Sequence, residues 1–361
     1  MIRNLLLICC LGFSSLIANA QSTPKYANAY LNIGVGGRAL AMASSATALD
    51  GDVNSAYWNP ASLVEMPNNV EVGYMHTNYF GGIGNYDYGA VAFKQKNGGV
   101  FALSFVRLGI DGVPNTIDLF RNGQIDYDRI TTFSVVDNAF IFSYAQKSLR
   151  DGLSIGGSAK ILHRKAGSFT NAWGFGVDAA IKYKPRADVA FALVARDVTS
   201  TFTAWKYDFT DSEKAVFTQT GNEIPQNSLE IALPRFILGA NKQFSISEEY
   251  SLTTELDLEL TTDGKRNTLL RSNLISVDPK FGLELGYLNK VYLRAGIGNF
   301  QEIQDINAGS SSWTLQPNIG AGVNLAKIDL DFAMTDIGDL SDAIYSYIFS
   351  VKFKINSKSA E

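Results

Sequence analysis

The stretch of sequence that decides the fold is YSYIFSVKFKI, residues 345–355. An aromatic and aliphatic stripe alternates with Ser346, Ser350, Lys352 and Lys354, and consists of Tyr345, Tyr347, Phe349, Val351, Phe353 and Ile355. Successive side chains of a strand point to opposite faces, so the stretch predicts a strand with one oily face. Such a strand near the end of the chain suits barrel closure. The alternative is a soluble antiparallel sandwich, whose strands also alternate.

Thirteen segments upstream alternate in the same way over roughly ten residues each, between Gly, Pro, Asn, Asp or Ser. They lie near 70–80, 86–96, 99–108, 138–147, 153–164, 173–184, 187–195, 235–244, 250–260, 280–288, 291–298, 315–325 and 327–335, and the last strand spans 344–355. The alternation is clearest in two segments. In 252–260 leucines lie on one face and acidic residues on the other, and in 328–335 apolar residues lie on the face opposite Asp329 and Asp331.

Connection lengths favour a membrane barrel over a sandwich. Every second connection is tight, at 97–98, 148–152, 185–186, 245–249, 289–290 and near 326. Longer connections lie between them at 109–137, 165–172, 196–234, 261–279, 299–314 and 336–343, with one short member at 81–85. Outer-membrane barrels combine short periplasmic turns with long external loops, and closure leaves no unpaired strand edge. We therefore predict an all-β fold, a 14-stranded antiparallel transmembrane β-barrel.

Composition agrees with a protein that meets lipid. Hydrophobic residues make up 46% of the chain, which has 22 Phe and 16 Tyr, while charged residues make up 18%. After the leader, no apolar run reaches the ~18 residues that a spanning helix needs. Without Arg3, 30 basic residues face 35 acidic ones, so we expect no surface for nucleic acid.

The first twenty residues predict a cleaved secretory signal, with basic Arg3, an apolar run over 5–17 and a small-residue end at 18–20. Cys9 and Cys10 both lie in this leader, so no thiol is expected in the mature chain. The expected divisions are a signal peptide at 1–20, a hatch segment at 21–69, the barrel at 70–356 and a tail at 357–361. The expected location is the cell outer membrane.

Residues 25–66, KYANAYLNIGVGGRALAMASSATALDGDVNSAYWNPASLVEM, lack a simple period. Side chains alone fill a barrel of about eight strands, so a larger barrel needs other contents, and this segment is the candidate plug. Its GVGGRA at 34–39 loosely fits a dinucleotide motif with Asp50 and Asp52 behind it, but no βαβ unit follows. The simpler interpretation is that these glycines let the backbone lie close to the barrel wall.

Catalytic and metal chemistry finds little support. His76 and His163 lie several strands apart and lack the H-E-x-x-H spacing of a metal pair. Some barrels carry hydrolytic sites at the rim, so a hydrolase stays a third and weaker alternative. We expect no catalytic residue, no metal and no cofactor. Inward charges, including Glu255, Asp257, Glu259, Asp329, Asp331, Lys352 and Lys354, are expected to pair in a hydrated lumen; alternatively they line a pathway or contact the plug.

The longest expected loop, 196–234, is rich in aromatic residues, namely Phe202, Trp205, Tyr207, Phe209 and Phe217. Exposed aromatics at this density indicate a partner-binding surface. The competing interpretation is an aromatic girdle combined with packing of the loop on itself.

Three pieces of the opening segment, KYAN at 25–28, LNIGVGGRAL at 31–40 and AYWNPASL at 56–63, resemble the start of the PorV/PorQ family of Bacteroidetes outer-membrane barrels. The hatch motif Trp58, Asn59, Pro60 and Ala61 is also similar to the hatch of the FadL fatty-acid transporters. We expect Asn59 to cap a short helix that begins at Pro60. The chain departs from the PorV/PorQ pattern at Ala41 and Ala43, where glycine is commoner.

The PorV/PorQ resemblance implies a part in type IX secretion. Its partners would be outer-membrane lipid, proteins of the translocon or attachment complex, and the C-terminal signal domains of secreted cargo. The leading expectation is a non-enzymatic adaptor that binds such partners through its long outer loops. The alternative is a FadL-like channel for hydrophobic small molecules, which needs an apolar pocket against the plug and an exit.

Overall fold

The computed structural model describes residues 27–79, 82–121, 124–305, 310–335 and 346–356. The expected signal peptide, residues 21–26 of the expected hatch, which include Lys25 and Tyr26, the connection at 336–343, residues 344 and 345 of the last expected strand, and the tail at 357–361 therefore lie outside the described residues. Within these ranges, no helix has the length and apolar character needed to cross a membrane.

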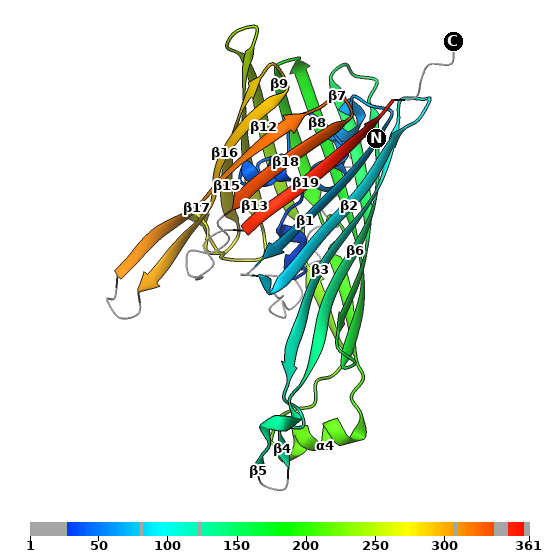
Figure 1. The fold of residues 1–361 in the computed structure, drawn as a ribbon, viewed down its shortest axis with the longest axis vertical. Helices are drawn as coiled ribbons and strands as arrows, with labels where there is room; N and C mark the ends of the chain where they lie inside the picture. Colours follow the sequence, from blue (N-terminus) through cyan, green and yellow to red (C-terminus); the bar gives the residue numbers. More distant parts are fainter. Residues whose placement is uncertain (1–26, 80–81, 122–123, 306–309, 336–345, 357–361) are drawn as a thin grey trace, which may run out of the picture.

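Fourteen antiparallel wall strands, here called staves, close into a barrel, which confirms the predicted fold (Figure 1). The staves are β1 (Val70–Tyr79), β2 (Gly84–Lys94), β3 (Val100–Asn115), β6 (Thr131–Lys147), β7 (Leu153–Ala166), β8 (Thr170–Arg186), β9 (Val189–Arg196), β12 (Arg235–Ser245), β13 (Tyr250–Thr261), β15 (Ser276–Tyr287), β16 (Val291–Asp305), β17 (Ser310–Asn324), β18 (Ile328–Thr335) and β19 (Ser346–Ile355). The last stave pairs with the first, from Val70 opposite Ile355 to Asn78 opposite Tyr347. Closure gives both end strands a hydrogen-bonded neighbour.

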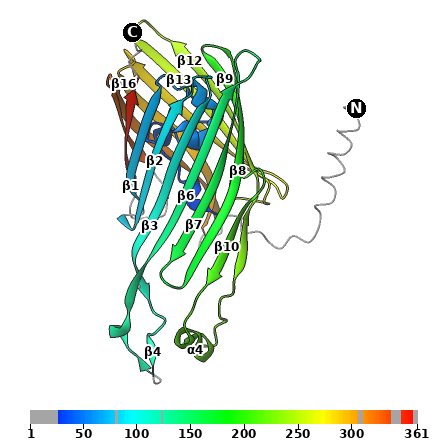
Figure 2. The same ribbon diagram turned by 90° about the vertical axis from the view of Figure 1, so that its right-hand side faces the viewer.

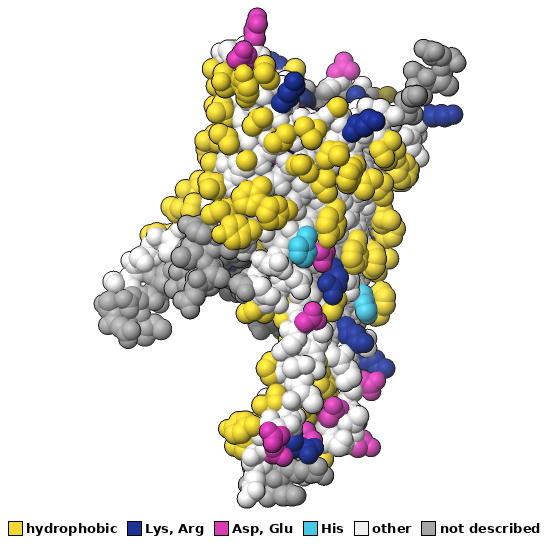
Figure 3. Space-filling model, in the orientation of Figure 1, with side chains coloured by type: hydrophobic (Ala, Val, Ile, Leu, Met, Phe, Trp, Pro, Cys, Tyr) yellow, Lys and Arg dark blue, Asp and Glu magenta, His cyan; other side chains and the backbone are white. Residues whose placement is uncertain are grey.

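The wall has the two faces that the alternation predicts. Phe349 is 62% exposed on the outside, whereas Glu255 on the lumen face is fully buried. Figure 3 shows hydrophobic side chains gathered in a broad band across the face of the barrel in view. Charged side chains inside the barrel and apolar side chains on its outer surface are the arrangement that a lipid bilayer requires.

Several staves run on where loops were expected. β3 and β6 stay paired through a bulge after Ile110 as far as Asn115 and Thr131, and β16 and β17 continue past a bulge at Gly298. The strands β4 (Phe120–Arg121) and β5 (Gln124–Ile125) and the turn η5 (Tyr127–Arg129) follow β3. The expected loops at 109–137 and 299–314 are thus partly strand. Outside the bilayer both faces are wet, so the alternation that marks a strand fades although its backbone pairing continues.

The expected loop at 196–234 is also largely regular. It contains β10 (Thr201–Tyr207), α4 (Asp211–Gln219) and β11 (Ser228–Ala232), while β14 (Leu270–Arg271) lies within 261–279. Figure 1 shows α4, β4 and β5 well beyond the end of the barrel, and Figure 2 shows α4 and β4 there from another side. We call these three elements the projecting arm. A capping box of Thr210 and Glu213 begins α4, a signal that the sequence carried.

β9 and β10 form one stave with an interruption. Both pair with β8, and opposite them β12 pairs with β9 while β11 pairs with β10. Between them, Asp197 and Ser200 adopt left-handed backbone angles, with φ of 54° and 60°. The Ser200 N–H donates to the Asp197 carbonyl within this turn at 2.7 Å, and the Val198 N–H keeps one backbone bond to β8, to the Val177 carbonyl at 2.8 Å. The wall is therefore irregular over residues 197–200.

Residues 27–69 of the hatch segment lie inside the barrel, as predicted, and are drawn in blue in Figure 1. They contain η2 (Ala29–Asn32), α2 (Gly37–Ala41), α3 (Ser55–Trp58) and η3 (Pro60–Glu65). Asn28 donates its N–H to Glu230 of β11, on the long-loop side, whereas Glu65 bonds Lys182 near the short turns. The hatch thus runs along the lumen before the chain enters β1.

Candidate functional site

The hatch motif forms the centre of the plug. Asn59 accepts a hydrogen bond from the Ala61 N–H at 2.9 Å and so caps η3, with Pro60 at the first position, as expected. Its amide also donates to the Thr47 carbonyl at 2.7 Å, and the Trp58 indole donates to the Val35 carbonyl at 2.9 Å. These bonds join three turns of the hatch into one body.

One side of the lumen holds the hatch by apolar contact. Val35, Leu40, Tyr57 and Leu63 belong to a buried cluster with Met75, Tyr86, Tyr88, Val106 and Ile141 of β1, β2, β3 and β6. Tyr57 meets Tyr88 edge to face, with ring centroids 6.4 Å apart. Non-directional burial of this kind stabilises the closed position without fixing it in detail.

The other side holds the hatch by charge. Arg38 makes a two-pronged bond to Glu284 of β15, at 2.7 and 2.8 Å, and Glu284 also binds Arg294 at 2.6 Å. The carboxylate of Asp257 accepts the Ala46 and Thr47 N–H groups at 2.9 and 3.1 Å. Two-pronged guanidinium bonds and charge-assisted bonds to backbone N–H groups are directional, so they set the orientation of the hatch.

Three further ion pairs join the hatch to the wall nearer the short turns. Asp50 binds Lys184, Asp52 binds Lys352 and Glu65 binds Lys182, at 2.6 to 2.9 Å. Burial by itself would raise the pKa of Asp50, but the hydrogen bond and charge of Lys184 hold that pKa below its ordinary value. The charged form of Asp50 is therefore the one that fastens the hatch.

Wall glycines make room for the plug. A Cβ on Gly296 would lie 2.3 Å from the carbonyl carbon of Met42, and one on Gly156 would lie 2.5 Å from the Ala61 nitrogen. The predicted role of the hatch glycines applies to Gly37, whose Cβ would meet Asp331 at 3.0 Å. Gly34 and Gly36 instead adopt φ of 95° and 82°, which a side chain disfavours.

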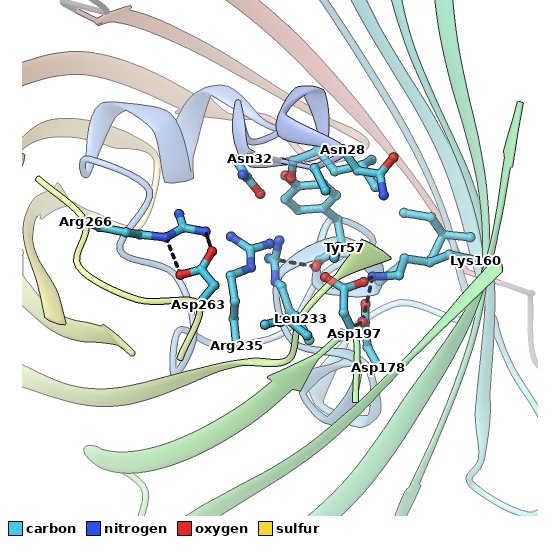
Figure 4. A pocket seen from close by; sticks show the side chains of 16 residues that line it. Asn28, Asn32, Tyr57, Lys160, Asp178, Asp197, Leu233, Arg235, Asp263 and Arg266 are labelled. Atoms are coloured by element: carbon cyan, nitrogen blue, oxygen red, sulfur yellow. Dashed lines mark hydrogen bonds and ion pairs between the residues drawn. The ribbon is translucent and has the colours of Figure 1, made fainter. Parts of the chain in front are cut away.

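A pocket lies between the hatch and the interrupted stave (Figure 4). Its lining includes Asn28, Tyr57, Lys160, Arg196, Asp197 and Arg235. Lys160 binds Asp178 at 2.7 Å and Asp197 at 2.5 Å, so the carboxylate at the interruption is neutralised. The cavity measures only about 30 Å³, which holds a few water-sized groups.

Arg196 is the unusual member of this pocket. It is 7% exposed, its guanidinium lies 4.8 Å from the ring centroid of Tyr57, and it donates to the Tyr57 carbonyl at 3.2 Å. Among the described residues it has no carboxylate partner, and its Nε is buried without an acceptor. Arg235 stands directly opposite on β12 but is neutralised by Glu259 at 2.8 Å. A buried charge normally has a partner.

The hatch separates two larger cavities. One, of about 480 Å³, lies toward the short turns and is lined by polar residues such as Arg38, Gln243 and Glu249. The other, of about 360 Å³, lies toward the long loops and is lined by residues that include Asn32, Lys280 and Asn318. Arg38 of the hatch lines the first cavity and Asn32 of the hatch lines the second, so the hatch lies between them.

The predicted inward charges fall into both expected groups. Glu259 pairs with Arg235 and Lys280, and Asp329 pairs with Lys354, as in a hydrated lumen. Residues 255, 257 and 352 contact the plug directly.

The five candidate loop aromatics do not form one surface. Phe202 faces outward beside Phe175, whereas the Trp205 indole donates to Glu230 at 2.8 Å. Tyr207, Phe209 and Phe217 pack on one another, with ring centroids 5.1 to 6.1 Å apart.

The two histidines lie on different staves, and His163 stacks on Trp173 with ring centroids 4.5 Å apart. Within the described ranges, no group of three His, Cys, Asp or Glu side chains could hold a metal.

No protein-family model matches this chain, and no curated protein sequence does. Solved structures match over most of its length. The toluene transporter TodX of Pseudomonas putida is 11% identical over 90% of this chain and 99% of its own, with a TM-score of 0.57. The toluene transporter TbuX of Ralstonia pickettii is 12% identical over 90% and 99%, with a TM-score of 0.54. A FadL homologue of Pseudomonas aeruginosa is 11% identical over 88% and 97%, with a TM-score of 0.50.

The fold is that of FadL-like outer-membrane barrels. At this identity the likeness concerns the fold alone. The location in the cell outer membrane stays a prediction from the sequence. Sequence reasoning missed Lys160, Arg196 and Asp197, because their meeting depends on the pairing of β7, β8 and β9 and on the interruption.

Proposed function

We propose that this protein is a hatch-gated channel that passes small apolar molecules across the outer membrane. The observation that carries the proposal is the interruption of a transmembrane stave at 197–200, directly beside the pocket between hatch and wall. An irregular stretch in a spanning strand is tolerated where it lines a cavity. Here it offers a lateral exit from the lumen into the membrane.

The closed structure requires the hatch to move during transport. The pocket beside the interruption is far smaller than the roughly 300 Å³ at which ligand sites begin. Apolar packing holds one flank of the hatch and ion pairs hold the other. Displacement would join the two cavities above and below it. No covalent step is involved, and the proteins that share this fold are named as transporters and channels.

A disulfide lock tests whether the hatch moves. An ideal Cβ on Gly298 of β16 lies 3.6 Å from the Cβ of Ala43 in the hatch, inside the disulfide range of roughly 3.5–4.5 Å. The double variant A43C/G298C is reconstituted in vesicles, and uptake of radiolabelled toluene and laurate is measured. Oxidation should reduce uptake to that of empty vesicles, and dithiothreitol should restore it. Each single cysteine variant is the matched control.

Two results would overturn the proposal. Uptake that survives complete cross-linking would show that transport does not need hatch movement. Uptake no faster than in empty vesicles, for the unmodified protein, would show that it is not a channel for these molecules.

A second candidate is an adaptor of type IX secretion. It is supported by the resemblance of LNIGVGGRAL at 31–40 and AYWNPASL at 56–63 to the PorV/PorQ family. In this proposal the barrel stays closed, and the projecting arm binds translocon or attachment-complex proteins or the C-terminal domains of cargo. The oxidised lock would then leave secretion unchanged.

The arm itself gives the matching test. Tyr207 and Asn227 are joined by a hydrogen bond of 2.9 Å, so residues 208–226 can be replaced by a short Gly-Ser linker without removing β10 or β11. The adaptor proposal expects loss of cargo secretion and of cross-links to secretion proteins. A variant that secretes normally would exclude this part of the arm from the role.

A further inference from the structure

A row of polar side chains crosses the outer face of six neighbouring staves. The register pairs its members directly, in the order His76, Asp87, Arg107, Asn138, His163 and Trp173. Directly paired residues of antiparallel strands point to the same face. That face is the outside, because Trp173 is 57% exposed while Met75, next to His76, is fully buried.

This row marks the edge of the lipid-facing band. The neighbouring outward row toward the short turns is mainly aromatic, with Tyr74, Phe105, Phe140, Ile161 and Phe175. The neighbouring row toward the long loops contains Asn78, Asn85, Lys165, Asn171 and Lys206. Aromatic girdles lie at the membrane interfaces of barrels, so the change from the aromatic row to polar side chains near Arg107 and Lys165 places these two groups at the level of lipid headgroups. The long-loop side corresponds to the outer leaflet.

Basic groups in this region make few bonds to the rest of the protein. Arg107 makes a single ion contact to Asp87, at 3.7 Å, and no hydrogen bond within the described residues. Its guanidinium extends over Gly109, where an added Cβ would lie 2.9 Å from it. Lys165 and Lys206 form no side-chain bond within those ranges either. Asp87 is already hydrogen-bonded to His76 at 2.7 Å. The groups that can still donate hydrogen bonds to a ligand are therefore the positively charged ones.

The directly paired row becomes apolar beyond β1. The row continues past His76 to Phe349 of β19 and Phe332 of β18, both apolar. Figure 3 shows histidine side chains with basic side chains near them along the lower margin of the hydrophobic surface. In these two rows the basic side chains are Arg107 of β3, Lys165 of β7 and Lys206 of β10.

We infer that this part of the outer face binds a phosphorylated glycolipid of the outer leaflet, with the lipid phosphate between Arg107 and Lys165. A guanidinium offers paired N–H donors that match phosphate oxygens, and the ammonium adds a second charge. The row of Tyr74, Phe105 and Phe140 supplies an apolar surface for the acyl chains. The inference is independent of whether the lumen conducts, because the site lies on the opposite face of the wall.

Binding of lipid A tests the site. The barrel in neutral detergent is mixed with diphosphoryl lipid A or with its dephosphorylated form, and bound lipid is counted by native mass spectrometry. The variant R107Q/K165Q should bind the diphosphoryl form about 10- to 100-fold more weakly, as expected for lost charge-assisted hydrogen bonds. The control K290Q/K327Q removes the same charge at the short-turn end and should bind like wild type.

Heat-modifiable migration on gels confirms that each variant has folded. High salt should weaken wild-type binding, because these groups are exposed to solvent ions. The inference is overturned if folded R107Q/K165Q binds as tightly as wild type. Equal binding of dephosphorylated lipid A to wild type would also overturn it, since acyl contact alone would then explain retention.

Discussion

A wedge in the wall should loosen the plug without touching the lipid-facing surface. The substitution Gly296→Ala places a methyl group 2.3 to 2.7 Å from three hatch backbone atoms, those of Met42 and Ala43. Ordinary contact begins near 3.4 Å, so the hatch must retreat by about 1 Å or the strand must bend. Overpacking of this kind costs about 1–3 kcal/mol. Because the contact exists only with the plug seated, that cost falls on the closed state.

The energy converts directly into an open fraction. With about 1.4 kcal/mol for each factor of ten, the population of displaced hatch should rise roughly 5- to 150-fold. Gly156→Ala presses on Ala61 and Pro60 from the other side of the lumen and should act in the same direction. Gly89→Ala is the matched control, because nothing lies within 4 Å of the added Cβ.

Leak across the membrane is the appropriate measurement. Conductance in planar bilayers and influx of a chromogenic β-lactam into whole cells both report an unplugged lumen, and heat-modifiable migration reports an intact barrel. The Gly296→Ala barrel should leak more than the Gly89→Ala barrel. If both variants fold and their leak is the same, the close fit between wall glycines and hatch does not control the lumen, and the reasoning fails.

Three further outcomes follow from single side chains. Asn59→Ala removes the cap on the Ala61 N–H and should speed hydrogen exchange in η3 about 5- to 30-fold, for a loss of about 1–2 kcal/mol; unchanged exchange would contradict the capping role. The lowered pKa of Asp50 means that its bond to Lys184 stabilises the hatch above the ordinary Asp pKa of about 3.9 and is lost below it. Exchange at 49–52 should therefore rise only in acid, and D50N should remove that dependence. R196Q should weaken laurate binding about tenfold with little effect on dodecanol, because a carboxylate would complement the unpaired guanidinium; equal losses for both ligands would refute this.

Much of the fold can be predicted from the sequence because a membrane places simple requirements on the residues that span it. Lipid demands an apolar outer face and every backbone group must be paired, so alternation with period two and loop parity identify all fourteen staves to within a few residues at the membrane. Asn59 and Pro60 predict the start of η3 for an equally local reason, since capping involves only neighbouring residues. The number of strands predicts the plug, because the side chains of a fourteen-stranded barrel cannot fill so wide a lumen.

The strand extensions and the projecting arm were not predicted, since alternation fades where both faces meet water. β3 and β6 continue to Asn115 and Thr131 through backbone pairing alone. The capping box at Thr210 was readable, but it predicts only where α4 begins and not where it lies.

The tertiary structure alone decided how the hatch meets the wall. Arg38 and Glu284 lie 246 positions apart in sequence, and no sequence pattern around either residue predicts that the two meet. In the sequence, Arg196 does not differ from other charges that face the lumen. In the structure, strand register places Arg235 opposite Arg196, and the interruption of the stave leaves Arg196 without a carboxylate partner. The sequence by itself determined which face of each strand meets lipid, because that choice depends on the residue and its immediate neighbours. Closure of the barrel decided which distant side chains share the lumen, because strand register and the path of the plug are properties of the whole sheet.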